Sequence, residues 1–303
     1  MWTVLAFISA LCLGFYDISK KIALRDNRVV DVLTISVCVS ALVLSVPLML
    51  SRLYPAAMSD AYAYVPTMDL QAHLFTLLKS VIVLSSWIFA YISLKHLPIS
   101  VVSPMQATRP MWTLIGALLI FQEHLNGWQW IGVLLAIGSI FVFSFKNHRK
   151  HPNNLNKQNK LYYICLALAI LIGSCSGLYD KYLMRQYDHN AVQVYYTLYQ
   201  AIMMLVVWAV MNRKSKRADR PAIQKIGVIV LISLFLIISD NVYMLALRDP
   251  DSLIAVVSTI RRGGAVIGFA YGLLFLKEPD PWRKALCMGG IMAGLICLAI
   301  GSI

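Results

Sequence analysis

The segment Leu161–Leu183, LYYICLALAILIGSCSGLYDKYL, decides the fold class of this chain. It is apolar or small-sided from its start to Tyr179, and about 20 such residues in a helix cross a hydrocarbon core about 30 Å thick. Lipid supplies no hydrogen-bond partners to the backbone, so a spanning segment must be a helix or part of a closed barrel. Because the run is continuous and does not alternate, it predicts a membrane-spanning helix.

Comparable runs fill the rest of the 303 residues. Hydrophobic residues make up 59% of the chain and charged residues 14%, with a mean hydropathy of +0.69, whereas soluble domains are about 25% charged. This composition argues against a cytosolic enzyme, a secreted disulfide scaffold and a nucleic-acid-binding protein. It predicts an all-α transmembrane protein with ten helices. The expected spans are Trp2–Leu24, Val30–Leu50, Leu74–Leu94, Ser100–Ile120, Trp128–Phe145, Leu161–Leu183, Ala191–Met211, Lys225–Leu247, Ser252–Leu276 and Arg283–Ile303.

The six cysteines all lie inside these apolar runs and form no Cys-x-x-Cys pair. Zinc sites and disulfide frameworks need characteristic cysteine spacings, which are missing. The thiols are therefore expected to be small buried side chains. We expect no metal site and no bound cofactor.

Basic residues divide unequally between the two faces that ten spans would create. The face away from the termini has 19 Lys and Arg residues, and the other has five, Arg52, Lys79, Lys181, Arg185 and Arg248. Cytoplasmic loops retain Lys and Arg, so this division predicts that both termini lie outside the cell. It also accounts for the net charge of +13 without a nucleic-acid partner.

The quoted segment also reveals an internal repeat. Its Gly177-Leu178-Tyr179-Asp180 matches Gly14-Phe15-Tyr16-Asp17 at an offset of 163, and Ala255-Val256-Val257-Ser258 matches Ser100-Val101-Val102-Ser103 at an offset of 155. The chain is therefore interpreted as two five-helix units, residues 1–150 and 160–303, joined by a polar linker. An odd number of spans per unit places the second unit upside down, and such inverted repeats are typical of secondary transporters.

Further features are shared between the halves. Glu123 and Glu278 each end a span at the offset of 155, Pro110 precedes Glu123 by 13 residues, and the final spans are rich in glycine. Together with the repeat, these features resemble the EamA-like family of the drug/metabolite transporter superfamily. The resemblance implies a small-molecule substrate in a central cavity. Tyr179–Leu183 and Ser258–Arg262 resemble a bacterial subgroup, which implies a location in the inner membrane. Many family members have cytoplasmic termini, whereas the loop charges of this chain predict external ones.

Four charged residues are expected near the middle of the membrane: Arg109, Asp240, Arg261 and Arg262. A charge at that depth costs at least about 2.5–3.5 kcal/mol, so each is a candidate for substrate binding or coupling. A guanidinium can bind a carboxylate or phosphate of a substrate, or simply pair with a buried Asp. We expect Asp240 to pair with Arg261 or Arg262, and substrate or proton binding to break that pair.

The repeat-related Asp17 and Asp180 are candidate gates, and Tyr16 and Tyr179 precede them. Asp17 has lysines at i+3 and i+4 that can neutralise it locally, whereas Asp180 has no such neighbour.

Trp87 and Tyr243 could line the cavity, as could Trp112 and Tyr91, although core packing is the simpler explanation for each one. Glu123 and Glu278 are interpreted mainly as structural caps.

These observations favour a secondary transporter that moves a small metabolite or drug-like solute across the bilayer by alternating access. The chain has no Gly-x-x-x-x-Gly-Lys-[Ser/Thr] motif, so proton coupling or exchange against a counter-substrate is expected in place of ATP. The alternative is a polytopic membrane enzyme of the prenyl or glycosyl transferase type. The lack of an Asp-rich metal motif or a histidine cluster disfavours it.

Overall fold

The computed structural model describes residues 1–24, 27–59, 61–96, 109–148, 157–213, 223–264, 267 and 281–301, and these residues form helices and connecting segments without a strand. Glu278 lies outside this described part, as do residues 149–156 of the linker and most of the expected span after Gly264.

Eleven helices occur in the described part, and each of the ten expected spans overlaps one of them. Six helices, α1, α2, α4, α8, α9 and α10, contain a segment long and apolar enough to cross a membrane. The short helix α3 was not expected. The bounds are α1 Trp2–Leu24, α2 Val29–Leu53, α3 Pro55–Met58, α4 Leu70–His96, α6 Arg109–Ile120, α7 Gly127–His148, α8 Lys157–Met184, α9 His189–Asn212, α10 Ile226–Arg248, α11 Ile254–Arg262 and α13 Pro281–Ile300.

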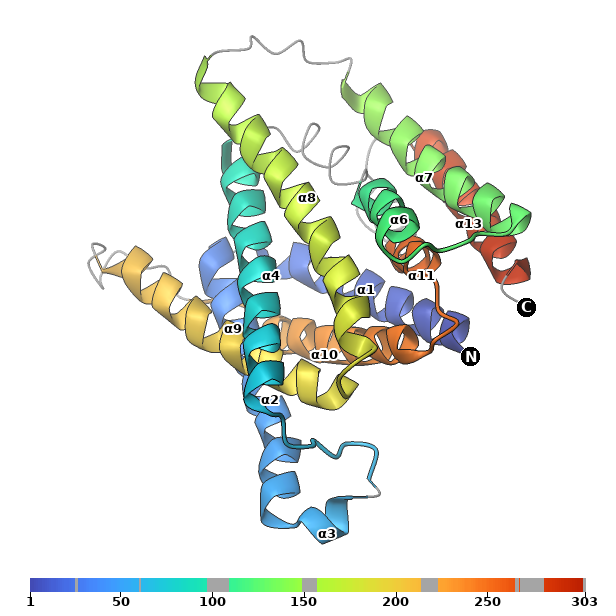
Figure 1. Cartoon of the computed structure of the whole chain (residues 1–303). Helices are drawn as coiled ribbons and strands as arrows, with labels where there is room; N and C mark the ends of the chain where they lie inside the picture. The colour runs from blue at the N-terminus through green and yellow to red at the C-terminus, as the bar shows by residue number, and fades with distance from the viewer. Residues whose placement is uncertain are drawn as a thin grey trace.

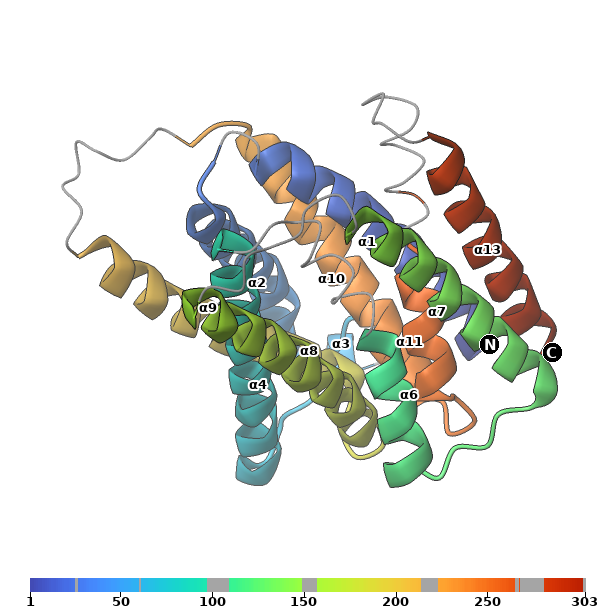
Figure 2. The same ribbon diagram turned by 90° about the horizontal axis from the view of Figure 1, so that it is seen from above.

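The helices pack mainly in pairs that join the two halves of the chain. α1 lies along α10, α4 along α8, α2 along α9, and α7 along α13 (Figures 1 and 2). The first pair is fastened by reciprocal serines, because Ser9 Oγ donates to Ser239 O at 2.8 Å and Ser239 Oγ donates to Ser9 O at 3.0 Å. The functional candidates of one half are therefore placed against helices of the other half.

Glycines allow close approach at two helix crossings. A Cβ at Gly132 would lie 2.7 Å from Gly294 O, which holds α7 tightly against α13. A Cβ at Gly264, directly after α11, would collide with Ala10 O on α1. Gly264 thus has the helix-packing role that small residues take in membranes.

The outer surface is apolar in the way that a lipid environment requires. Large apolar side chains such as Leu42, Leu119 and Val210 are more than half exposed, and soluble monomers rarely expose many of them together. Both chain ends lie on the same side of the molecule, whereas α3 projects from the bundle in Figure 1.

Candidate functional site

An ion pair between α10 and α11 forms the centre of the candidate site. Arg261 Nη2 donates to Asp240 Oδ1, so the pair that the sequence predicts is present with Arg261 as the partner. The guanidinium also lies over the Tyr243 ring, with 4.1 Å between its Cζ and the ring centroid. Its Nε is buried and has no hydrogen-bond partner in the described structure. Arg261 therefore retains a free donor beside its carboxylate partner.

A second ion pair, between α4 and α8, was not foreseen. Lys79 Nζ donates to Asp180 Oδ1, and the ammonium lies 4.6 Å from the centroid of the Tyr196 ring. Lys79 is 2% exposed and Asp180 is 8% exposed. One sequence-based expectation is thus wrong, because Lys79 is a buried membrane charge and does not belong to a loop. Asp180 has no neutralising neighbour on its own helix, as expected, but it has a partner on α4. That partner comes from another helix, so local spacing could not reveal it.

Two further arginines lie close to these pairs without an ion pair of their own among the described residues. Arg109 is the first described residue of α6. Its Nη2 makes only a long contact of 3.5 Å with Ser86 Oγ. Its guanidinium occupies the space over Gly173 on α8, where any Cβ would collide with it. Arg262 is attracted electrostatically by Asp17, and the Asp17 side chain is exposed.

The aromatic candidates are distributed around this group of charges. Tyr243 contacts Arg261 directly, and Tyr16 is buried on α1 with the Lys20 ammonium 5.5 Å from its ring centroid. Tyr179 donates to Phe75 O at 3.1 Å. Trp87 packs in apolar clusters between α2, α4 and α9, which corresponds to the core-packing alternative.

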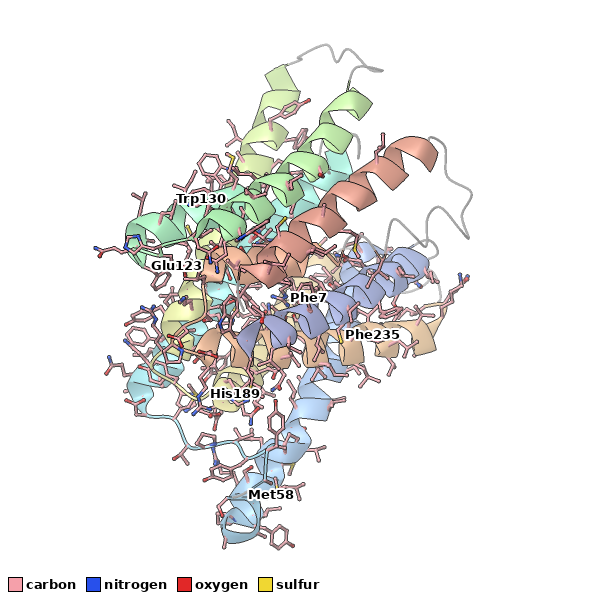
Figure 3. The ribbon with its side chains drawn as sticks, turned by 90° about the vertical axis from the view of Figure 1, so that its right-hand side faces the viewer. Phe7, Met58, Glu123, Trp130, His189 and Phe235 are labelled. Atoms are coloured by element: carbon pink, nitrogen blue, oxygen red, sulfur yellow. The ribbon has the colours of Figure 1, made fainter. Side chains whose placement is uncertain are left out.

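Glu123 and Lys181 form a buried anchor between the two halves of the chain (Figure 3 labels Glu123). Lys181 Nζ donates to Glu123 Oε1 at 2.9 Å and to Ser252 O. The carboxylate also accepts from the first backbone N–H groups of α11, Ile254 N at 2.7 Å and Ala255 N at 3.2 Å. Glu123 is thus a helix cap, as expected, but of a distant helix, and Lys181 is buried in α8 and not a loop charge.

The carboxyl group of Asp188, which lies outside the spans, has a shifted pKa. Asp188 precedes α9 and caps it by accepting from Asn190 N and Ala191 N. Burial raises the pKa of Asp188, but the His189 ring, whose Nδ1 lies 3.6 Å from Oδ2, and the hydrogen bonds from these backbone groups outweigh that effect, so the net pKa lies below its usual value. The carboxylate stays ionised at neutral pH and holds Arg248 Nη1 at 3.2 Å.

Comparison with known proteins agrees with this architecture. Residues 1–145 match the model of the EamA-like transporter family. These residues belong to the EamA-like transporter family. The family match and the apolar helices support an integral, multi-pass membrane protein, and the matched family transports small solutes.

One solved structure shares the fold over nearly the whole length of the chain. This crystal structure of a protein superposes with a TM-score of 0.73 at 11% sequence identity, covering 99% of this chain and 96% of that chain. At this identity the likeness concerns the fold alone. No curated protein matches the sequence.

Proposed function

We propose that this EamA-like protein is a secondary transporter of the bacterial inner membrane that moves a small solute with an anionic group by alternating access. The observation that carries the proposal is the group of charges between the two halves. Lys79, Arg109, Arg261 and Arg262 face Asp17, Asp180 and Asp240, which are four cations against three anions. These charges are expensive at bilayer depth, and such groups mark substrate or ion pathways.

The pattern of helix contacts supports two inverted repeats, residues 1–150 and 160–303. The test is to exchange each helix of the first half with its counterpart in the second half, which pairs α1 with α8, α2 with α9, α4 with α10, α6 with α11 and α7 with α13. The α1–α10 contact then becomes α8–α4, the α6–α8 contact becomes α11–α1, and α4–α9 becomes α10–α2. The α2–α9, α6–α11 and α7–α13 contacts map onto themselves. Such an exchange is what a two-fold axis in the membrane plane produces, and rocking of the halves about it exposes a central site to either face in turn.

The surplus of cations favours a carboxylate or phosphate on the substrate. Arg262 and Arg109 have no carboxylate within ion-pair distance in the described structure, and Arg261 Nε has no acceptor. A guanidinium offers a planar fork of donors that fits both anions. Protonation of Asp240, or binding of a counter-substrate, would loosen its pair with Arg261 and link occupancy to rocking.

A screen followed by transport tests the proposal. Purified protein is screened by thermal shift against amino acids, organic acids, nucleosides and amines, and hits are assayed for uptake and counterflow in proteoliposomes. We expect anionic compounds to stabilise the protein and to be transported. Asp240→Asn should abolish transport in folded protein, whereas the exposed loop variant Asp251→Asn should leave it intact. Amines as the only transported class would contradict the anionic substrate, and conversion of a hit without movement would favour the membrane-enzyme alternative.

A further inference from the structure

A pocket opens between α2, α9 and α10 at the membrane face that bears residues 61–69. It has a volume of about 320 Å³. One side of its wall is apolar, with Leu44 and Pro47 on α2, and the other carries the amides Asn190, Gln193 and Asn241. We call this space the outer vestibule. Most of the wall is apolar, and these three amides are its polar part.

A second, smaller cavity lies deeper between the same three helices and reaches Asp240. Its volume is about 10 Å³, room for about one water molecule. Ser40 and Gln200 line it, each 3% exposed, and Ser40 Oγ and Gln200 Nε2 have no hydrogen-bond partner in the described structure. Buried polar atoms are almost always satisfied by protein or by ordered water. One water molecule between Ser40, Gln200 and Asp240 would satisfy these two atoms.

The Gln193 side chain separates the two spaces. Gln193 and Ile237 belong to the walls of both the outer vestibule and the inner cavity. Gln193 Nε2 donates to Ile237 O at 2.7 Å, and its Oε1 accepts from Asn241 Nδ2 at 2.7 Å. The one amide that belongs to both walls is thus held by two hydrogen bonds at the connection between the outer vestibule and the inner cavity.

Tyr62 covers the same connection from outside. Its hydroxyl donates to Asn241 Oδ1 at 2.6 Å, and its carbonyl accepts from Asn190 Nδ2 at 2.6 Å. The loop residue is therefore tied to the amides that hold Gln193 in place. Movement of this loop would release Asn241 and weaken one of the two bonds that close the path.

We propose that the outer vestibule and the inner cavity form a gated water path that gives protons access to Asp240 from the face bearing residues 61–69, with Gln193 as its gate. The inference deepens the proposed function, because it supplies the coupling route to the central ion pair. At Asp240 the protons would meet the titratable and charged groups that interact with this carboxylate electrostatically. These groups are Arg261 on α11, Tyr16 on α1, Asp180 on α8, Tyr196 on α9 and Tyr243 on α10 itself.

Accessibility of an introduced thiol to Ag⁺, a small hydrated cation, tests the path without a substrate. A chain with all six cysteines replaced receives Ser40→Cys as the reporter of the inner cavity. Ala63→Cys reports on the outer vestibule, and Leu42→Cys, 70% exposed on the apolar surface, is the control outside the path. Ag⁺ is added to either side of oriented proteoliposomes, and the remaining free thiols are counted with a fluorescent maleimide after denaturation.

We expect Ser40→Cys to react from the 61–69 face alone. With Gln193→Ala it should react about tenfold faster, as expected from the loss of the two hydrogen bonds that hold the gate. Gln193→Leu, which fills the space with apolar atoms, should not accelerate the reaction. Gln193→Asn, which is shorter but polar, replaces the alanine variant if that variant does not fold.

Two results would overturn the proposal: a Ser40→Cys thiol that stays unreactive beside a shortened Gln193 while Ala63→Cys reacts, or equal rates in all Gln193 backgrounds. Either result leaves the transport proposal standing, because the thiol assay needs no transported solute. A failed transport screen would likewise leave the thiol assay informative.

Discussion

Replacing Glu123 with Gln should destabilise the protein because it leaves the Lys181 ammonium without its counter-charge inside the bundle. The side chains of Lys181 and Glu123 are 1% and 3% exposed, and their N–O distance is 2.9 Å. Removing one member of a pair buried to this degree costs about 3–5 kcal/mol, since the remaining charge stays desolvated. The glutamine keeps an oxygen that can accept from Ile254 N, so this estimate concerns the charge and not the helix cap.

Thermal unfolding in detergent measures the effect. For a chain of this length, about 2 °C of melting temperature corresponds to each kcal/mol, which predicts a decrease of roughly 6–10 °C. Adding Lys181→Met removes the stranded ammonium and should restore most of the loss. Arg248→Ala is the matched control, because its ion pair with Asp188 is more than half exposed on the arginine side and such pairs contribute at most about 1 kcal/mol. A Glu123→Gln protein as stable as Arg248→Ala, or a double variant no more stable than the single one, would refute the anchor.

Other changes test the charges and the topology. Arg262→Lys should lower uptake of an anionic substrate at least about tenfold in folded protein, because an ammonium cannot reproduce the guanidinium fork, and unchanged uptake would leave Arg262 with a structural role. Gly173→Ala should displace Arg109 and impair transport, whereas alanine at Gly138, where a Cβ meets open space, should be tolerated in the same uptake assay. A thiol introduced next to Met1 should be labelled from outside intact cells and one within residues 153–159 should not, and the reverse pattern would contradict external termini.

The positions of the helices could be predicted from the sequence because the lipid requirement acts on each segment alone. The expected Trp2–Leu24 coincides with α1, and the other helix ends, where both are described, differ from expectation by a few residues. Charges with no local explanation, such as Asp240 and Arg261, were found for the same reason, since their cost at bilayer depth can be judged from one helix. Helix α3 was missed because four residues, Pro55–Met58, carry no periodic pattern.

The partners of buried lysines could not be predicted in this way. Lys79 and Lys181 lie near the ends of expected spans, where lysines commonly reach the membrane surface, so both were counted with the loops. Their acids are 101 and 58 positions away along the chain. Only the packing of α4 against α8, and of the Glu123 segment against α8 and α11, brings these charges together. With both lysines removed from the loop count, the face of the termini retains three of its five basic residues, which strengthens the asymmetry behind the predicted topology.

A carboxylate cap and an ion pair hold α11 at its opposite ends. Glu123 binds the backbone N–H groups at its start, while Arg261 in its last turn pairs with Asp240. The start of α11 is joined to the first half of the chain through Glu123. The side chains of Glu123 and of its partner Lys181 are both buried. The end of α11 is held by the Arg261–Asp240 pair. Asp240 borders a water-sized cavity, and the Nε of Arg261 is a free donor. In the proposed transport cycle, a ligand or proton would therefore release the end of this nine-residue helix while its start stays fixed, and so turn occupancy into movement.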